Sequence, residues 1–360
     1  MLENHPAFFR TLAVASLLIL LAFLVPVRKV VPQSIYNGAG FPYQAFSDLS
    51  ATRIELEQGV LEVAFAPGRT RLSHEEILAW VESSAQSIVA YYGRLPTRTA
   101  KMLIVPVSGS RMNGTTFGYG GAASRILFGR DNTLRGLERD WVLVHELVHH
   151  GFPFVAGRNW LHEGVATYVE PIARVQSGLI PVDEVWRQLV AGLPQGQPRS
   201  GDQGLDGTPT WGRTYWGGAM YFLIADVEIR RRTSNRKGLQ HVLQRTVAEG
   251  GNITKEWTVE RLNSVGARAT GTNVLAELYD CMKDAPRVVN LPALWRDLGV
   301  RRAGRQMAYD ENAQLAHIRR AITEPLANRE VRQHAAPPRD SEHPAPAACA
   351  NIPWIDTQKS

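Results

Sequence analysis

Residues 141–168, WVLVHELVHHGFPFVAGRNWLHEGVATY, decide how the middle of the chain folds. Two largely apolar stretches, 142–148 and 160–169, are separated by a short segment that contains Gly151 and Pro153. Glycine and proline commonly end helices. The pattern therefore predicts one helix that ends near residue 150 and a second helix over 160–175, which the intervening loop folds back on the first. Gly164 on the second helix lets another backbone approach closely.

Histidine and glutamate recur in these helices at a spacing that suits a metal ion. His145 and His149 lie four residues apart, so a helix places both imidazoles on one face. Glu146 adjoins that face and can reach a metal-bound water. The motif also occurs in helices whose histidines only cap or pack. A catalytic zinc site needs a third protein ligand; Glu163 on the second helix is the candidate, and the adjacent His162, which points elsewhere on that helix, is the competitor.

Together, HELVH and WLHEGVATYVE resemble the gluzincin metallopeptidases, whose pattern is HExxH followed by a helix with WLxEGxAxY. The resemblance covers roughly residues 100–300 and implies a thermolysin-like zincin catalytic domain with Zn²⁺ held by His145, His149 and Glu163. Segment 215–230 is similar to the tyrosine-bearing helix of the glycyl aminopeptidase family. That similarity places the family tyrosine at Tyr215, where it would donate a hydrogen bond to the developing oxyanion.

The function that the resemblance implies is a zinc-dependent peptidase acting on a peptide or protein substrate, with Glu146 as general base. The alternative is a catalytically inactive zincin-fold binding protein at the membrane. Glu146 and Tyr215 argue against it, because a binding module needs neither. Glu170 lies two helical turns after Glu163 and is expected either to accept a hydrogen bond from a ligating histidine or to face solvent before Pro171.

A glycine-rich strand over 118–124 is expected to bind substrate through backbone groups around Gly120 and Gly121. Exopeptidase relatives carry an acidic residue on this edge strand to bind the free amine of the substrate, and residues 118–124 contain none. We therefore expect better cleavage of internal bonds or blocked peptides than of free amino-acid amides.

The fold class expected is α+β: a small β sheet from residues 52–66, 101–107 and 114–129, followed by a mainly helical C-terminal part. Ser73 and Glu76 form a capping-box pattern that begins a helix through Tyr92. Another helix is expected over 134–150 and a surface loop over 194–213. The expected organisation is a membrane segment over 1–29, a linker over 30–50, a catalytic domain over 51–213, a helical subdomain over 214–333 and a Pro/Ala-rich, poorly ordered tail over 334–360.

Residues 11–27, TLAVASLLILLAFLVPV, carry no charge and indicate a membrane signal. As a helix they would rise about 25 Å, slightly less than a hydrocarbon core of ~30 Å. We expect an uncleaved signal anchor that places a single-pass protein in the cell membrane, with the catalytic domain outside the cytoplasm; a cleaved signal peptide is the alternative. No other segment has eighteen apolar residues, which argues against an intramembrane protease.

Charge and cysteine content bound the remaining possibilities. The net charge is +6, with one basic cluster over 230–237. No aromatic residues interleave with it, so nucleic-acid binding is not expected. Cys281 and Cys349 are the only cysteines. They cannot form a structural zinc site alone, and the sequence leaves open whether they form a disulfide.

Overall fold

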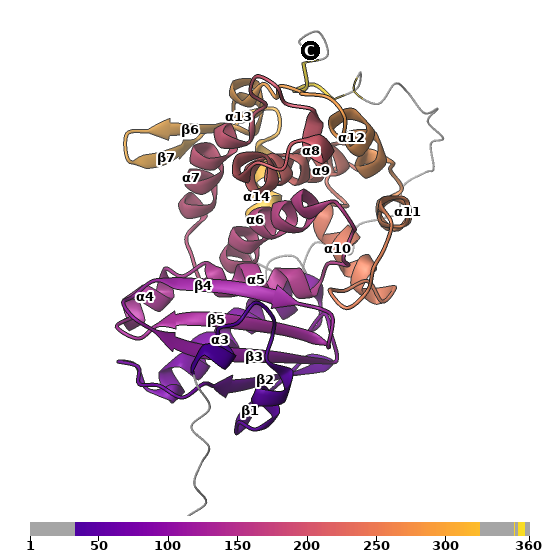
Figure 1. The fold of residues 1–360 in the computed structure, drawn as a ribbon. Helices are drawn as coiled ribbons and strands as arrows, with labels where there is room; N and C mark the ends of the chain where they lie inside the picture. Colours follow the sequence, from indigo (N-terminus) through magenta and orange to yellow (C-terminus); the bar gives the residue numbers. More distant parts are fainter. Residues whose placement is uncertain (1–32, 325–348, 350–351, 357–360) are drawn as a thin grey trace, which may run out of the picture. The chain divides into compact units, whose positions relative to one another are not determined.

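The computed structural model describes residues 33–324, 349 and 352–356, within a compact unit that begins at Gln33. Strands come first and helices follow, which confirms the α+β class (Figure 1). The predicted membrane segment, 11–27, lies outside the described residues. Among the residues that are described, no helix has both the length and the apolar character needed to span a membrane. The domain borders expected from the sequence stay predictions.

A five-stranded sheet forms the first half of the described chain. Its order is β1-β2-β3-β5-β4, with β2, β3 and β5 parallel and the outer strands β1 and β4 antiparallel to their neighbours. The strands are β1 (Ala51–Leu56), β2 (Gly59–Phe65), β3 (Thr99–Val107), β4 (Met112–Phe117) and β5 (Ala122–Gly129). No other strand among the described residues pairs with the outer side of β4, which therefore presents a free edge at the side of the sheet that lies next to the helices (Figure 1).

Helix α3 (His74–Tyr92) connects β2 to the parallel strand β3. It begins at the predicted capping box, in which Ser73 and Glu76 exchange hydrogen bonds, and ends at Gly93 in the left-handed conformation. α3 packs against α5 (Val142–His150) and α6 (Asn159–Gln176), and α5 also contacts β4 and β5. Their contacts give a buried apolar core shared by sheet and helices.

The helix predicted over 134–150 is broken in two, α4 (Leu134–Glu138) and α5. The break lies at Asp140, whose carboxylate accepts a hydrogen bond from the backbone N–H of Leu143 at 3.0 Å. A short acidic side chain that bonds the backbone in this way favours a helix start over a helix interior. The metal motif therefore sits on a short helix of its own.

Helices dominate the rest of the unit. The predicted loop 194–213 contains short helical turns, and the predicted helix after residue 214 begins as a π-helix, η2 (Gly212–Gly217), that runs into α9. The other elements are α7 (Val182–Gly192), η1 (Leu193–Gly196), α8 (Gly204–Gly207), α9 (Gly218–Arg232), α10 (Leu239–Ala248), α11 (Val259–Thr270), α12 (Val274–Met282), α13 (Leu291–Leu298), β6 (Val300–Ala303), β7 (Gln306–Tyr309) and α14 (Ala316–Thr323); before the sheet lie α1 (Gln33–Tyr36) and α2 (Tyr43–Ser47).

Part of the tail is packed, which differs from the expectation of poor order. Cys349 forms a disulfide with Cys281 of α12. Beyond it, Trp354 is buried, and its indole N–H donates to Asp297 of α13 at 2.9 Å. The apolar residues of the sequence NIPWI explain why this stretch binds the core although the Pro/Ala-rich sequence before it suggested a loose tail.

Candidate metal and peptide-hydrolysis site

Helices α5 and α6 bring the three predicted ligands together. His145, His149 and Glu163 each offer one donor atom, and these atoms all lie within 4.8 Å of one another. Oε2 of Glu163 is 3.2 Å from Nε2 of His145 and 3.7 Å from Nε2 of His149. Burial and the neighbouring His145 lower the pKa of His149 to about 3, so its imidazole is in the neutral form that binds metals. Two imidazoles and one carboxylate converging in this way are a donor set that fits Zn²⁺.

His162 is turned away from this cluster. Its Nε2 accepts a hydrogen bond from the backbone N–H of Val155 at 3.0 Å. Burial lowers the pKa of His162 to about 4. The adjacent Glu163 is the residue of this pair that faces the two histidines, as the helix spacing suggested.

The side chain of Glu146 on α5 contacts β4, the strand at the free edge of the sheet. Burial raises its pKa to about 7, opposed by the charge of His145 and by a hydrogen bond from Thr116 of β4. A carboxyl with such a pKa can accept and return a proton near neutral pH. The strand leaves space for it at Gly114, where an added Cβ would lie 2.2 Å from Cγ of Glu146.

Tyr215 lies on the π-helix beside the cluster. Its ring stacks near that of His145, with 6.3 Å between centroids, and its hydroxyl lies within the influence of the Glu163 charge. Burial and the charge of Glu163 raise the pKa of Tyr215 to about 12, so the phenol keeps its proton at neutral pH. Single-turn π-helices are frequent at functional sites.

A close helix crossing holds Tyr215 in this place. α6 and α9 meet backbone to backbone at Gly164 and Gly218, where an added Cβ on Gly164 would lie 2.5 Å from Cα of Gly218. Gly164 follows the ligand Glu163, and Gly218 follows Tyr215 by one helical turn. The sequence predicted a close approach at Gly164, and its partner is the glycine-rich start of the tyrosine helix.

Glu170 is buried on α6, and its Oε1 accepts a hydrogen bond from Arg174 at 2.7 Å. Burial raises its pKa to about 7, against the opposing charge of Arg174. The bond therefore comes from Arg174 and not from the predicted ligating histidine, and Glu170 does not face solvent. Its role at the site stays a prediction.

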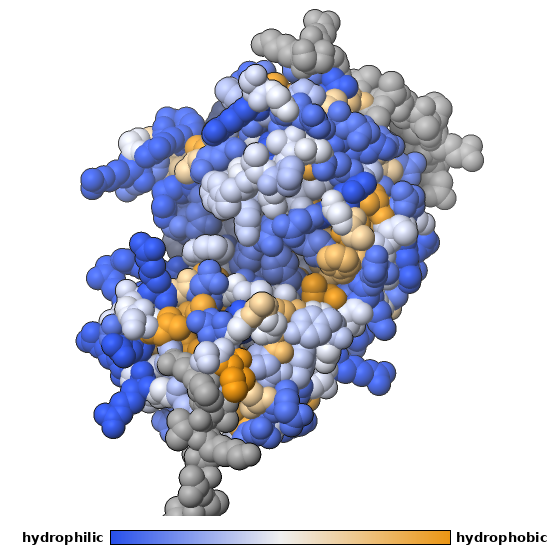
Figure 2. Space-filling view, viewed as in Figure 1, coloured by the Kyte–Doolittle hydropathy of each residue, from blue (hydrophilic) through white to orange (hydrophobic). Residues whose placement is uncertain are grey.

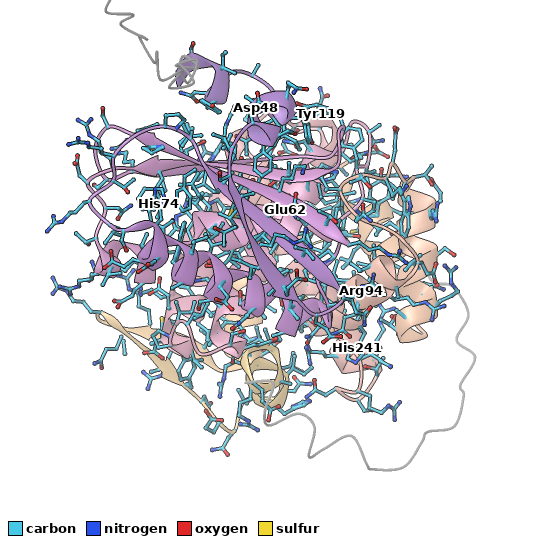
Figure 3. All side chains as sticks on the ribbon, turned by 90° about the horizontal axis from the view of Figure 1, so that it is seen from below. Asp48, Glu62, His74, Arg94, Tyr119 and His241 are labelled. Carbon is cyan, nitrogen blue, oxygen red and sulfur yellow. A yellow bond between two sulfur atoms is a disulfide. The ribbon has the colours of Figure 1, made fainter. Side chains whose placement is uncertain are left out.

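The expected substrate-binding strand needs a correction of position. Residues 118–121 are the turn between β4 and β5, and the edge strand is Met112–Phe117. The turn is held by the segment before the sheet: Tyr43 donates to the carbonyl of Gly121 at 2.7 Å, and an added Cβ on Gly120 would meet the Tyr43 ring. Figure 3 shows Tyr119 of this turn next to the N-terminal helices, away from the middle of the sheet. Gly120 and Gly121 thus pack against Tyr43, which leaves no observation in favour of substrate binding.

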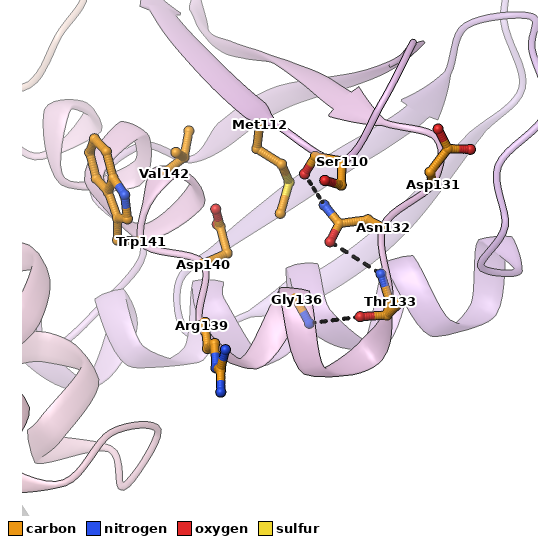
Figure 4. Close-up of a pocket in the computed structure, with 10 residues that line it drawn as sticks. All are labelled: Ser110, Met112, Asp131, Asn132, Thr133, Gly136, Arg139, Asp140, Trp141 and Val142. Atoms are coloured by element: carbon orange, nitrogen blue, oxygen red, sulfur yellow. Dashed lines mark hydrogen bonds between the residues drawn. The ribbon is translucent and has the colours of Figure 1, made fainter.

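Two cavities of about 540 Å³ each have an exposed tryptophan in the wall, and each tryptophan lies next to a ring of the site. The first lies between the start of β4 and the start of α5, with Trp141 in its wall (Figure 4). The centroid of the Trp141 ring is 5.4 Å from that of the His145 ring. Trp211 belongs to the second, 5.9 Å from the Tyr215 ring. The surface is hollowed between the sheet and the helices above it (Figure 2).

Sequence reasoning missed Gly114, Thr116 and Trp211. Gly114 and Thr116 are two residues apart on one strand, so they share the face that meets Glu146. Which residues of this strand face Glu146 could be worked out only once the strand was known to begin at Met112. Nothing in the sequence around Trp211 indicated a role. The structure shows it exposed, just before the helix that carries Tyr215.

A scan against protein-family models found no match, and neither did a search of curated proteins. Solved structures do match. An aminopeptidase N family protein from Idiomarina loihiensis has a TM-score of 0.56 at 14% identity, over 70% of this chain and 49% of that one. An M1 zinc metallopeptidase from Deinococcus radiodurans has a TM-score of 0.44 at 15% identity, over 65% of this chain and 52% of that one. The chain therefore spans about half the length of these proteins, and the first match shows that it shares the fold of that aminopeptidase N family protein over the matched part.

Proposed function

We propose that this chain is a zinc-dependent peptidase in which His145, His149 and Glu163 bind the metal. The observation that carries the proposal is the convergence of their donor atoms within 4.8 Å, with the carboxylate of Glu146 and the phenol of Tyr215 alongside. The shared fold with an aminopeptidase N family protein supports it. The closer likeness to the glycyl aminopeptidase family and to thermolysin-like domains rests on the sequence motifs.

The chemistry follows from the roles that these groups can fill. When bound, zinc would polarise the scissile carbonyl and lower the pKa of water. Glu146 takes the proton from the attacking water and passes it to the leaving amine. Tyr215 donates a hydrogen bond to the oxygen on which negative charge develops. An extended peptide can add to the free edge of β4 through its backbone.

Metal content and hydrolysis, measured on the full-length chain, test this proposal. We expect about one zinc per chain and cleavage of a peptide library that a chelator abolishes. Glu163→Ala should lose zinc because a ligand is removed, whereas His162→Ala should keep it, because His162 bonds Val155. Glu146→Gln should keep zinc and lose nearly all hydrolysis, since an amide cannot accept the water's proton.

Two outcomes would contradict the assignment. Full zinc occupancy in Glu163→Ala would remove Glu163 from the ligand set. Zinc binding without hydrolysis of any peptide would favour the alternative, an inactive zincin-fold binding protein.

We further propose that residues 11–27 tether the chain to the cell membrane, with the catalytic part outside the cytoplasm. The apolar run supports the tether. The Cys281–Cys349 disulfide supports an oxidising compartment, where such bonds persist. Fractionation and protease accessibility of intact spheroplasts test both parts, and recovery of the intact chain from the soluble cytosolic fraction would refute them.

A further inference from the structure

We propose that Thr116, Ser124 and His150 form a buried chain of hydrogen bonds that holds the carboxylate of Glu146, which makes Thr116 a positioning residue for hydrolysis. The inference rests on the proposed function, because it concerns the general base of that reaction.

The chain joins three elements. Oγ1 of Thr116 on β4 lies 2.7 Å from Oε2 of Glu146 and 2.9 Å from Oγ of Ser124. Ser124 is directly opposite Thr116 on β5, and its Oγ lies 2.8 Å from Nε2 of His150 at the end of α5. Ser124 and His150 are fully buried, so water does not compete along the inner part of the chain.

The direction of donation follows from the carboxylate end. As a general base Glu146 is ionised and only accepts, so Thr116 donates its single hydroxyl proton to it. Thr116 must then accept from Ser124, and Ser124 must accept from the N–H at Nε2 of His150. Among the described residues Nδ1 of His150 has no hydrogen-bond partner, which agrees with a bare nitrogen there and the proton on Nε2.

Thr116 has a second acceptor within reach, the backbone carbonyl of Glu146 at 2.9 Å. The contact with the carboxylate is shorter, and hydrogen bonds to ionised groups are the stronger ones. Successive donors also polarise one another, so the bonds behind Thr116 strengthen its donation. The proton of Thr116 therefore goes mainly to Oε2.

Space and hydrogen bonding act on Glu146 from the same strand. Gly114, two residues before Thr116, leaves room for Cγ and the carboxyl of Glu146, which an added Cβ would meet at 2.2–2.6 Å. Thr116 donates its hydrogen bond to Oε2, which leaves Oε1 as the oxygen that can take the proton of the attacking water. Strand β4 thus fixes both the position and the rotation of the general base.

Fixed geometry of this kind is worth a large factor in rate, since a misplacement of about 1 Å can cost on the order of 10²-fold. We expect Thr116→Val to lower kcat about 10–100-fold with KM little changed, because the isosteric side chain keeps the packing and loses the donor. Thr116→Ser should recover activity to within about threefold, because it restores the hydroxyl. Ser124→Ala should show a smaller loss, and little further loss when added to Thr116→Val, because both act through one chain.

Thr52→Val is the matched control, since it makes the same substitution at an exposed position of β1, the strand at the opposite edge of the sheet from β4. It should behave as wild type. Zinc content and Tm, measured for every variant, should stay near wild type. Turnover of Thr116→Val within threefold of wild type, in an enzyme that Glu146→Gln inactivates, would overturn the inference and leave the proposed function standing. Failure of Thr116→Ser to recover would assign Thr116 to packing and also overturn it. Activity in Glu146→Gln would instead contradict the proposed function.

Discussion

Tyr215 shows how one residue acquires its task from its surroundings. The phenol is half-buried beside His145 and Glu163 and keeps its proton because its pKa rises to about 12. A neutral donor suits an oxygen that becomes negative during the reaction, since it adds no charge that competes for the ligands. Stacking between the rings of Trp211 and His145 holds the phenol beside the cluster before substrate arrives.

Tyr215→Phe should therefore lower kcat on the order of 10²–10³-fold, the usual cost of removing one oxyanion donor. KM and zinc content should change little, because the bond forms mainly in the transition state. Tyr221→Phe is the control: its hydroxyl donates to the carbonyl of Leu275 at 2.9 Å, so its loss should affect stability more than turnover. Normal turnover in Tyr215→Phe with a crippled Tyr221→Phe would move the donor role to Tyr221.

The sequence predicted the residues that belong to compact motifs and missed those that depend on strand register. The four-residue spacing of His145 and His149 follows from helix geometry, and the close pass at Gly164 follows from the lack of a side chain. Thr116 could not be found in the same way. Its contact with Glu146 depends on where β4 begins, and a one-residue shift of a strand turns every side chain to the other face.

At the scale of elements, the site depends on how closely α6 approaches α9. Gly164 and Gly218 let the two helix backbones touch, and this contact places the π-helix with Tyr215 over Glu163. The position of Tyr215 therefore depends on the short distance between the backbones of α6 and α9. The sequence indicated both helices but not the π-helix, because its extra residue per turn is a response to packing and not a local preference.

Gly218→Ala tests this crossing. Its new Cβ would lie 2.3 Å from the carbonyl oxygen of Trp160 and 2.7 Å from Cα of Gly164, and backbone atoms cannot move aside as a flexible side chain can. We expect a destabilisation of about 1–3 kcal/mol, as for other overpacked positions, and a loss of turnover as Tyr215 moves away. Thermal unfolding and kcat are the measurements. Gly38→Ala is the control, since the nearest atom to its added Cβ is 3.9 Å away; equal behaviour of the two variants would contradict the role of the crossing.

At the scale of the whole molecule, distant segments combine to complete the unit. The disulfide closes a separation of 68 residues and fixes the segment with Trp354 against α13. The sequence left this bridge undecided, because pairing depends on the distance between two Cα atoms that only the fold sets. The α+β class, in contrast, follows from the order in which strand and helix patterns occur along the chain.

The open cleft between sheet and helices leads to the last prediction, that substrates extend on both sides of the cleaved bond. β4 offers a free backbone edge to an added peptide strand. Two cavities of about 540 Å³ have in their walls tryptophans that lie next to the rings of His145 and Tyr215, which offers room for peptide residues beyond the cleaved bond. An enzyme that removes single N-terminal residues would instead need a partner for the free amine.

The corrected edge strand, Met112–Phe117, has no carboxylate, as was also true of the strand first expected. The cavity beside it contains Asp140 and Asp131, but Asp140 accepts a hydrogen bond from the backbone of α5, and Asp131 points away from the other lining side chains (Figure 4). A charged amine bound along β4 would therefore lose water without gaining a buried partner.

We expect an N-acetylated peptide to be cleaved at least as fast as the unblocked peptide of the same sequence, and free amino-acid amides to be poor substrates. Comparison of kcat/KM for the matched pair is the measurement. A clear preference for the unblocked peptide would contradict the prediction, and loss of that preference in Asp140→Asn would identify the carboxylate that binds the amine.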